Sequence, residues 1–272
     1  MKILTSVAFA LLVPCTSLPA NSDALRFSVP DGRVLNEFYR EGPVAAHVVL
    51  RSGADARVVV AFPAGNSGVA LWFDAPATFA WSPTVTLNQA RRELPGARLL
   101  HGVSAELVAH GGDLTVTRVL AGSVRVIRAC QDNAQEPPAE MLMMPRLAGD
   151  TVTWERQRLD GAPGYSVALR VVRGTLGGGG GRPFELVPAA NGELRLRITA
   201  LTGEPPLTAL AADEVLTAAA TPDTRLRQAL TFLSFEEKLL AGSWRFNTYF
   251  GRDTLMSLEL LAPVLQRRAF EA

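Results

Sequence analysis

The feature that most constrains the fold is a change in hydrophobic period near Gly203. Before it, apolar residues occur at every second position, as the segment ELRLRITAL illustrates. A period of two predicts strands with one buried face. After the two prolines of GEPPLT, residues 203–208, the apolar spacing is typical of helices. The sequence therefore predicts a β domain over residues 21–205 and a helical region over residues 206–272.

The β region is expected to be antiparallel. HVVLRSGADARVVVAF predicts a hairpin that turns at residues 52–55, and LTVTRVLAGSVRVIRA predicts another that turns near Gly122. YSVALRVVRG is a further β-rich run. No helical pattern of about ten residues separates the strands, so the β-α units of a parallel sheet are not expected. The predicted fold class is mainly β, an N-terminal antiparallel β-sandwich.

Three helices are predicted after the β region. ALAADEVLTAAA suggests a short linker helix, and TPDTRLRQALTFLSFEEKLLAG suggests an amphipathic helix from Pro222 and Asp223 to Gly242. Its expected apolar face contains Leu226, Leu230, Leu233 and Leu240, and its expected polar face contains Arg227, Gln228, Glu237 and Lys238.

The third predicted helix, residues 254–266, is apolar on almost every side. Such a helix is expected to be buried inside a larger helical layer, and Pro263 should bend it or end it early. Too few helical segments precede it to surround it. We therefore expect the natural protein to continue beyond Ala272, with the helical domain incomplete here.

The first residues have the pattern of a cleaved export signal. Lys2 precedes an apolar run over residues 7–13, then Pro14 and small residues lead to Ala20. The run is too short to cross a bilayer, which takes roughly 20 residues. We expect a signal peptide over residues 1–20 and a periplasmic or secreted protein. Its removal would leave Cys130 without a partner for an intrachain disulfide.

The remaining composition argues against several classes of partner and cofactor. The formal net charge is +1 and neither sign is clustered, which gives no support for a nucleic-acid or membrane partner. His47, His101 and His110 have no metal-ligand spacing, and we expect no cofactor. LGGGGGRP, residues 176–183, precedes a strand pattern, so a loop between strands is expected and not a phosphate site.

Residues 130–145, CQDNAQEPPAEMLMMP, are polar and then interrupted by prolines, which predicts a long loop. The methionines of this segment are expected to fill gaps in the core. They are Met141, Met143 and Met144.

The loop before the third helix carries the residue types of a sugar site. Aromatic side chains at Trp244, Phe246, Tyr249 and Phe250 precede the pair Arg252 and Asp253. Aromatic faces pack on the C–H surfaces of sugars, while guanidinium and carboxylate groups hold hydroxyls. The residues alone favour a structural role instead, with Asp253 as the N-cap of the helix and Arg252 as its ion-pair partner.

The segment FLSFEEKLLAGSWRFNTYFGRDTLMSLELL resembles the start of the catalytic domain in bacterial glycogen-debranching-enzyme-like proteins of the amylo-α-1,6-glucosidase type. The resemblance covers about residues 232–264. It implies an (α/α)6 barrel behind a β-sandwich, so the helices here would be the first of a truncated barrel. It also implies that Arg252 and Asp253 hold glucosyl hydroxyls in the −1 subsite. Trp244, Tyr249 and Phe250 would form the wall of that subsite.

No catalytic residue is assigned in this chain. The resemblance places the general acid and base in later barrel helices. Asp253 and Glu259 cannot replace them, since six helical residues separate side chains by about 9 Å of rise and about 240° of rotation. An inverting pair instead flanks one bond from two sides at roughly 6.5–9.5 Å. Glu259 is expected to be a buried group paired inside the barrel.

Two functions remain open from the sequence. One is the N-terminal portion of an exported glycoside hydrolase that acts on an α-glucan or oligosaccharide. The other is a non-catalytic β-sandwich that binds carbohydrate or protein and has a helical tail.

Overall fold

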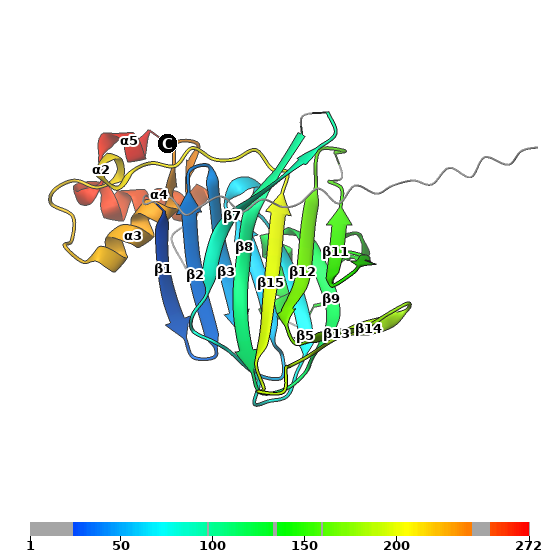
Figure 1. Cartoon of the computed structure of the whole chain (residues 1–272). Coiled ribbons are helices and arrows are strands. Elements are labelled where there is room, and N and C mark those ends of the chain that lie inside the picture. Colours follow the sequence, from blue (N-terminus) through cyan, green and yellow to red (C-terminus); the bar gives the residue numbers. More distant parts are fainter. Residues whose placement is uncertain (1–23, 97, 133–134, 159, 241–250, 272) are drawn as a thin grey trace, which may run out of the picture.

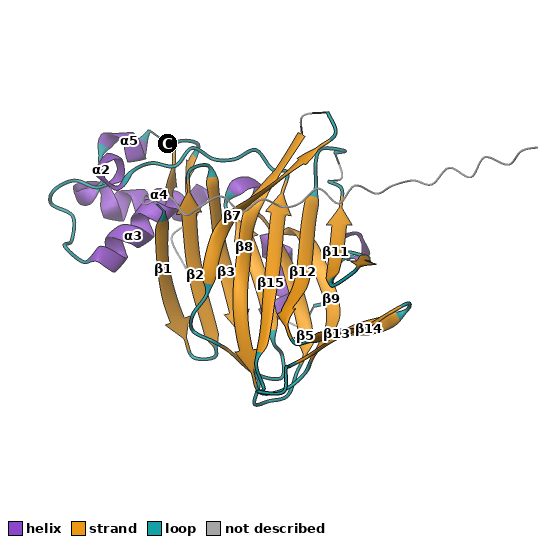
Figure 2. Cartoon of the chain, in the orientation of Figure 1, coloured by secondary structure: helices purple, strands orange, loops and turns teal. Residues whose placement is uncertain are grey.

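The computed structural model of the 272-residue chain describes residues 24–96, 98–132, 135–158, 160–240 and 251–271. Its strands form two facing antiparallel sheets, and most of its helices lie together at one side of them (Figures 1 and 2). The predicted mainly β class with antiparallel sheets, followed by a few helices, is confirmed. That these helices begin an (α/α)6 barrel stays a prediction.

The first sheet has the strand order β1-β2-β3-β4-β5-β9-β14-β13. A one-turn helix, η1 (Ala64–Asn66), joins β4 to β5. The strands are β1 (Leu25–Asp31), β2 (Val34–Glu41), β3 (Val44–Arg51), β4 (Arg57–Phe62), β5 (Ser67–Asp74), β9 (Leu114–Ser123), β14 (Arg182–Val187) and β13 (Thr175–Gly179).

The second sheet has the order β10-β11-β12-β15-β8-β6, and β7 also pairs with β8. Its strands are β10 (Pro145–Ala148), β11 (Thr151–Arg156), β12 (Tyr165–Arg173), β15 (Leu194–Thr202), β8 (Arg98–His110), β6 (Ala80–Trp81) and β7 (Thr86–Leu94).

The main core fills the space between the two sheets because alternate side chains of each strand face inward. In β15 the predicted inward residues are all buried, whereas Arg197 is exposed. They are Leu194, Leu196, Ile198 and Ala200. The alternation read from the sequence is therefore confirmed, and β15 ends at Thr202, just before the predicted boundary.

One of the two predicted hairpins forms and the other does not. β3 and β4 pair as expected, with Arg51 opposite Arg57. Near Gly122 the prediction is wrong, because β9 continues through this residue and the helix α1 (Val124–Asp132) follows. VRVIRAC fits a helical period as well as a period of two. Ile127 and Cys130 of α1, three residues apart, are buried on the side of the helix that packs against the outer face of the first sheet.

The loop predicted over residues 176–183 is wrong for most of its length, because residues 176–179 belong to β13 and residues 182–183 to β14, whereas the loop predicted over residues 130–145 holds for residues 135–144, after α1 ends at Asp132. A strand does follow the glycine run, but the connection is short, since β13 and β14 form a hairpin that turns at residues 180–181. Residues 135–144 contain only the short η2 (Ala139–Met141). Met141 and Met143 are buried, as predicted, whereas Met144 is 79% exposed, so the core prediction is wrong for it.

The region after β15 contains helices and one small hairpin. The elements are α2 (Ala212–Val215), α3 (Thr224–Leu233), β16 (Ser234–Phe235), β17 (Lys238–Leu239), α4 (Gly251–Leu261), η3 (Ala262–Val264) and α5 (Arg267–Phe270). The short linker helix is confirmed as α2. α3 starts beside Asp223, as predicted, and Asp223 is its N-cap, since its carboxylate accepts hydrogen bonds from the backbone N–H groups of Arg225 and Leu226.

The end of α3 differs from the prediction. The helix stops at Leu233 instead of Gly242, because Ser234 is extended and opens the β16–β17 hairpin. Glu237 and Lys238 therefore lie on this hairpin and not on the polar face of a long helix. Leu226, predicted on the apolar face, is 53% exposed.

A buried arginine holds the end of α3 against the first sheet. Arg40 in β2 donates from Nη1 to the carbonyl oxygens of Thr231 and Ser234, the latter at 3.2 Å. Its Nη2 donates to the carbonyl oxygen of Leu210 at 2.7 Å. Burial lowers the pKa of Arg40 to about 10. The guanidinium thus adds donors to carbonyl groups at the end of the helix, where intrahelical hydrogen bonds run out.

Aromatic side chains pack the helical segment on β1 and β2. Phe27 stacks on Phe38 with ring centroids 4.6 Å apart, and Phe232 of α3 meets Phe38 edge-on at 5.1 Å. Phe235 and Leu239 of the hairpin complete this cluster. The start of the helical region is therefore fixed to the outer face of the first sheet.

Candidate functional site

The residues of the predicted sugar subsite are only partly described. Arg252 and Asp253 lie in the first turn of α4. Trp244, Tyr249 and Phe250 lie outside the described residues. The structure therefore places the charged pair of the subsite.

Asp253 is not the N-cap that the sequence predicted. α4 includes Gly251 and Arg252, so Asp253 already lies within its first turn. A carboxylate there still interacts favourably with the helix dipole. Arg252 Nε and Nη2 each lie 3.4 Å from Asp253 Oδ1, and the two side chains are 86% and 44% exposed. Because both side chains are exposed, both charged groups are accessible to a ligand. An exposed ion pair of this kind adds little stability.

Thr254 fixes the start of α4 to the hairpin. Its side chain is buried, and its hydroxyl donates to the carbonyl oxygen of Leu239 in β17 at 3.1 Å. On the same hairpin, Lys238 Nζ donates to the carbonyl oxygen of Pro63 at 2.5 Å. The first turn of α4 is thereby connected, through the hairpin, to the β4–β5 connection of the sandwich.

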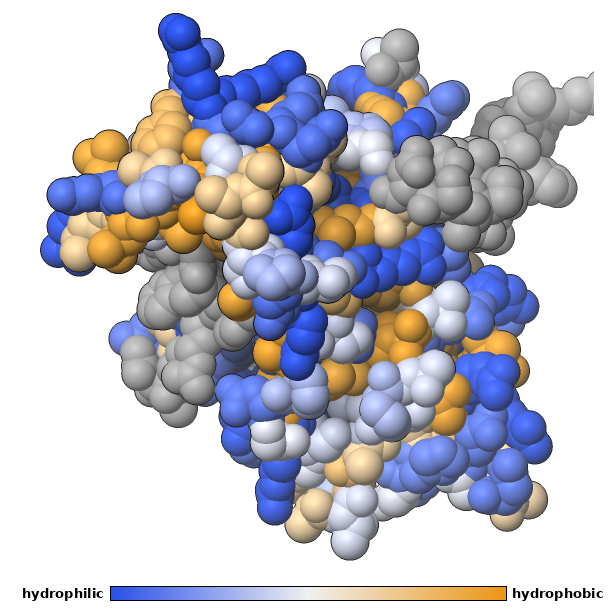
Figure 3. All heavy atoms as spheres, turned by 90° about the vertical axis from the view of Figure 1, so that its left-hand side faces the viewer, coloured by the Kyte–Doolittle hydropathy of each residue, from blue (hydrophilic) through white to orange (hydrophobic). Residues whose placement is uncertain are grey.

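The burial predicted for the helix after Thr254 is wrong for this chain. Leu255, Met256 and Leu260 are 68%, 56% and 79% exposed. Figure 3 views the molecule from the side of the helices and shows hydrophobic surface among hydrophilic groups there. Pro263 does end the helix early, since α4 stops at Leu261 and the short η3 follows. Few side chains of the described segment pack against this side of α4.

Glu259, expected to be a buried group, is exposed. It shares α4 with Asp253, so the helical separation of the two carboxylates argues against a catalytic pair. Among the described residues no group of three or more His, Cys, Asp or Glu side chains could hold a metal ion.

The buried histidines have structural roles. His47 Nε2 lies 3.0 Å from Asn36 Oδ1, and its ring stacks on Phe38. Burial lowers the pKa of His47 to about 3, which keeps the ring neutral. His101 Nε2 lies 2.7 Å from the carbonyl oxygen of Glu204, and burial lowers its pKa as well.

Sequence reasoning missed a polar network around Glu204, which follows β15. Arg158 donates to the Glu204 carboxylate and also pairs with Asp160 at 2.6 Å. The phenol of Tyr165 donates to Glu204 Oε1 at 3.2 Å. Burial raises the pKa of Tyr165, and the nearby Glu204 carboxylate raises it further. Tyr165 is therefore a protonated donor beside a carboxylate that is already paired.

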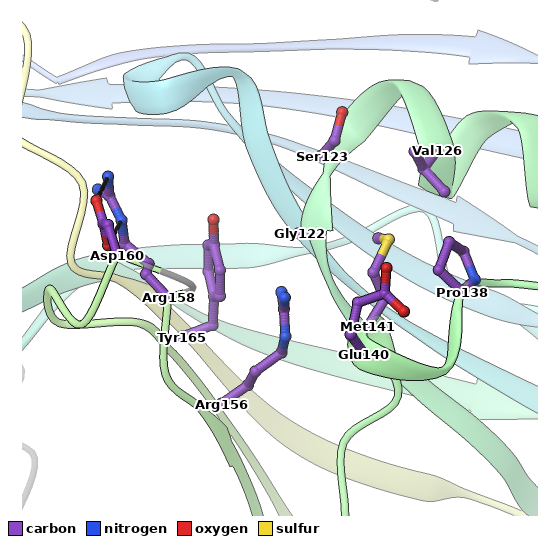
Figure 4. Close-up of a pocket in the computed structure, with 10 residues that line it drawn as sticks. All are labelled: Gly122, Ser123, Val126, Pro138, Glu140, Met141, Arg156, Arg158, Asp160 and Tyr165. Atoms are coloured by element: carbon purple, nitrogen blue, oxygen red, sulfur yellow. Dashed lines mark hydrogen bonds and ion pairs between the residues drawn. The ribbon is translucent and has the colours of Figure 1, made fainter.

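A cavity adjoins this network at one end of the sandwich (Figure 4). Its volume is about 430 Å³. Its walls come from β9, α1, η2, β11, β12 and the loop after β11. The lining residues are Gly122, Ser123, Val126, Pro138, Glu140, Met141, Arg156, Arg158, Asp160 and Tyr165. The only sequence signal for it was WERQR, whose alternation places Arg156 and Arg158 on one side of the chain.

Comparisons with known proteins found no family model, no curated protein and no solved structure that matches this chain. In the part of the chain that the structure describes, no helix is both long enough and apolar enough to span a bilayer.

Proposed function

We propose that this chain is the N-terminal portion of an exported glycoside hydrolase that acts on α-glucosidic bonds, similar to glycogen-debranching enzymes. Its substrate would be an α-glucan or an oligosaccharide, and no cofactor would be needed. The proposal rests on the resemblance of residues 232–264 to that family, together with a β-sandwich that precedes helices.

The observation that carries the proposal is the accessibility of Arg252 and Asp253 at the start of α4. A guanidinium donates to sugar hydroxyls and a carboxylate accepts from them, so this pair can hold two hydroxyls of one glucosyl unit. Trp244, Tyr249 and Phe250 are proposed as the wall of this subsite, again from the resemblance.

The proposed reaction is hydrolysis with inversion by two carboxylates that flank the glycosidic bond. Neither carboxylate is assigned to a residue of this chain. The subsite would therefore bind and orient the sugar, while the acid and the base would come from a longer natural protein. The present residues alone are expected to be inactive.

The signal-peptide pattern of residues 1–20 supports the exported location. Recovery of the native protein from the periplasm or medium, with a mature N-terminus near residue 21, would agree with it. A protein that retains Met1 and stays in the cytoplasm would contradict it.

The enzyme proposal is tested with the natural gene product, including any residues after Ala272. Hydrolysis of isomaltose and maltooligosaccharides is compared among wild type, Arg252→Lys and Asp253→Asn. Arg267→Lys and Glu271→Gln are matched controls, because this pair is also exposed on a nearby helix. The proposal predicts a loss of activity only for the first pair. Equal activity in all variants would refute the subsite.

The alternative is a non-catalytic β-sandwich protein that binds carbohydrate or protein through the sandwich and has a helical tail. The cavity on the sandwich favours it. A natural gene product that binds glycans but shows no hydrolysis of any tested α-glucoside would support this alternative.

A further inference from the structure

The cavity beside β11 and β12 has the size of a small-molecule site. Its volume of about 430 Å³ lies within the range of roughly 300–1,000 Å³ that is usual for such sites. None of its lining residues comes from the helical segment after residue 206. It is therefore separate from the Arg252–Asp253 subsite.

Arg156 supplies an available cation on one wall. Its side chain is half-buried, and its Nη1 donates to the carbonyl oxygen of Ala121 at 2.7 Å. The guanidinium carbon lies 6.0 Å from the ring centroid of Tyr165. Within the described residues no carboxylate comes within ion-pair distance of Arg156. A guanidinium has five N–H donors, so several of them can serve a ligand.

Glu140 supplies a carboxylate on another wall. It belongs to η2, it is exposed, and within the described residues no cation forms an ion pair with it. Figure 4 shows Arg156 and Glu140 rising from different elements around one space. The hydroxyl of Ser123 is also exposed at this cavity. The available groups are thus a donor fork, an acceptor and a hydroxyl.

The other charged groups beside the cavity are already paired with one another. Arg158 donates to Asp160 at 2.6 Å and also to Glu204. The Arg158 guanidinium needs no anionic ligand, because it already has two carboxylate partners. The two available charges, on Arg156 and Glu140, cancel each other. A ligand with a net charge of either sign would gain from one of them and lose to the other.

We propose that this cavity binds a neutral saccharide unit between Arg156 and Glu140. Sugar hydroxyls both accept from a guanidinium and donate to a carboxylate, which a simple anion or cation cannot do. The apolar side chains of Val126, Pro138 and Met141 supply contact for the C–H surface of the ring. The inference concerns the sandwich alone and does not depend on the proposed hydrolase.

The test titrates the full chain, labelled with ¹⁵N, with four neutral trisaccharides: maltotriose, isomaltotriose, cellotriose and xylotriose. Binding is followed at the backbone amides of Ser123 and Val126, which report on this cavity. Glucuronate and glycylglycine serve as an anionic and a zwitterionic probe of comparable polarity. We expect at least one trisaccharide to shift these amides saturably and more tightly than either charged probe.

Two variants locate the site. Arg156→Met and Glu140→Gln should each raise the dissociation constant about tenfold or more, since each removes a charged hydrogen-bond partner. Arg146→Met, on exposed β10, removes the same charge outside the cavity and should leave binding unchanged. Glu140→Gln is the decisive variant, because Glu140 is exposed and its substitution does not disturb the Arg156–Ala121 bond.

Three results would overturn the proposal. These are no saturable shift with any trisaccharide, tighter binding of glucuronate or glycylglycine, and trisaccharide binding that survives Glu140→Gln unchanged. A separate titration of Arg252→Met distinguishes the two sites. If Arg252→Met abolished binding at α4 but left the shifts at Ser123 normal, the result would concern only the α4 subsite and the proposed hydrolase.

Discussion

The Arg40→Met substitution tests how the helical segment is held on the sandwich. Arg40 is 7% exposed and donates to three backbone carbonyl groups, at Leu210, Thr231 and Ser234. Methionine keeps much of the apolar volume of the side chain but has no donor. The variant therefore removes the hydrogen bonds with little change in packing.

The expected loss is the balance of two opposing effects. Hydrogen bonds from one charged donor to three carbonyl groups contribute about 5 kcal/mol together. Burial of the charge costs roughly 3.5 kcal/mol, because the pKa falls from 12.5 to about 10 and each unit corresponds to about 1.4 kcal/mol. Two of the carbonyl groups also retain a backbone donor, from Ser234 N and Leu210 N. We expect Arg40→Met to lower the free energy of unfolding by about 1.5 kcal/mol, which corresponds to a fall of about 3–6 °C in Tm.

Urea unfolding and hydrogen exchange measure this effect together. Exchange should accelerate first at the amides of Leu210 and Leu240, since both are held against the end of α3. Arg33→Met, in the exposed turn between β1 and β2, is the matched control and should stay within about 0.5 kcal/mol of wild type. An Arg40→Met protein as stable as this control, with unchanged exchange at both amides, would refute the reasoning.

Three further predictions concern activity and pH. The 272-residue chain alone should not hydrolyse maltooligosaccharides or isomaltose above a no-enzyme control, since no acid–base pair is assigned to it. In the natural full-length protein, Asp253→Asn should raise the transition-state barrier by about 2–4 kcal/mol in kcat/KM with little change in melting. His47 should make stability fall as pH drops from 6.5 towards about 3, because only the unfolded state takes up a proton on this ring over that interval. Its signature is a weaker pH dependence of the unfolding free energy in His47→Gln than in wild type.

Each of these predictions has a contradicting result. Measurable turnover by the chain alone would show that a catalytic pair was overlooked. Normal kcat/KM with normal melting in Asp253→Asn would make this residue a helix-stabilising group only. For the histidine, the exposed His110→Asn is the control. If His47→Gln and His110→Asn kept the same pH dependence as wild type, His47 would not be the group responsible.

The strands could be predicted because their information is local. Over residues 194–200 of β15 each inward residue is apolar and each outward residue is polar, so the period of two alone defines the buried face of this part of the strand. The same rule failed after Gly122, where VRVIRAC satisfies both periods. The choice of helix there depends on Met141 and Trp72, which lie elsewhere in the sequence and pack with Ile127 and Cys130.

The end of α3 could not be predicted for a similar reason. A long amphipathic pattern continues past Leu233, but Arg40 of β2 donates to the carbonyl groups of Thr231 and Ser234 at that point. Contacts between residues so far apart in sequence leave no local trace. The same holds for the cavity, where the register of β11 and β12 places Arg156 opposite Tyr165 and η2 brings Glu140 to them.

The candidate subsite could be proposed from the sequence because Arg252 and Asp253 are adjacent in a recognisable segment, and it stays a prediction. Its position in space depends on the sandwich instead. Thr254 binds the carbonyl of Leu239, and Lys238 of the same hairpin binds the carbonyl of Pro63. Arg40 holds the opposite end of this hairpin through Ser234. The β domain therefore fixes the first turn of α4 from two sides, which gives it a role in positioning the charged pair, whichever partner that pair binds.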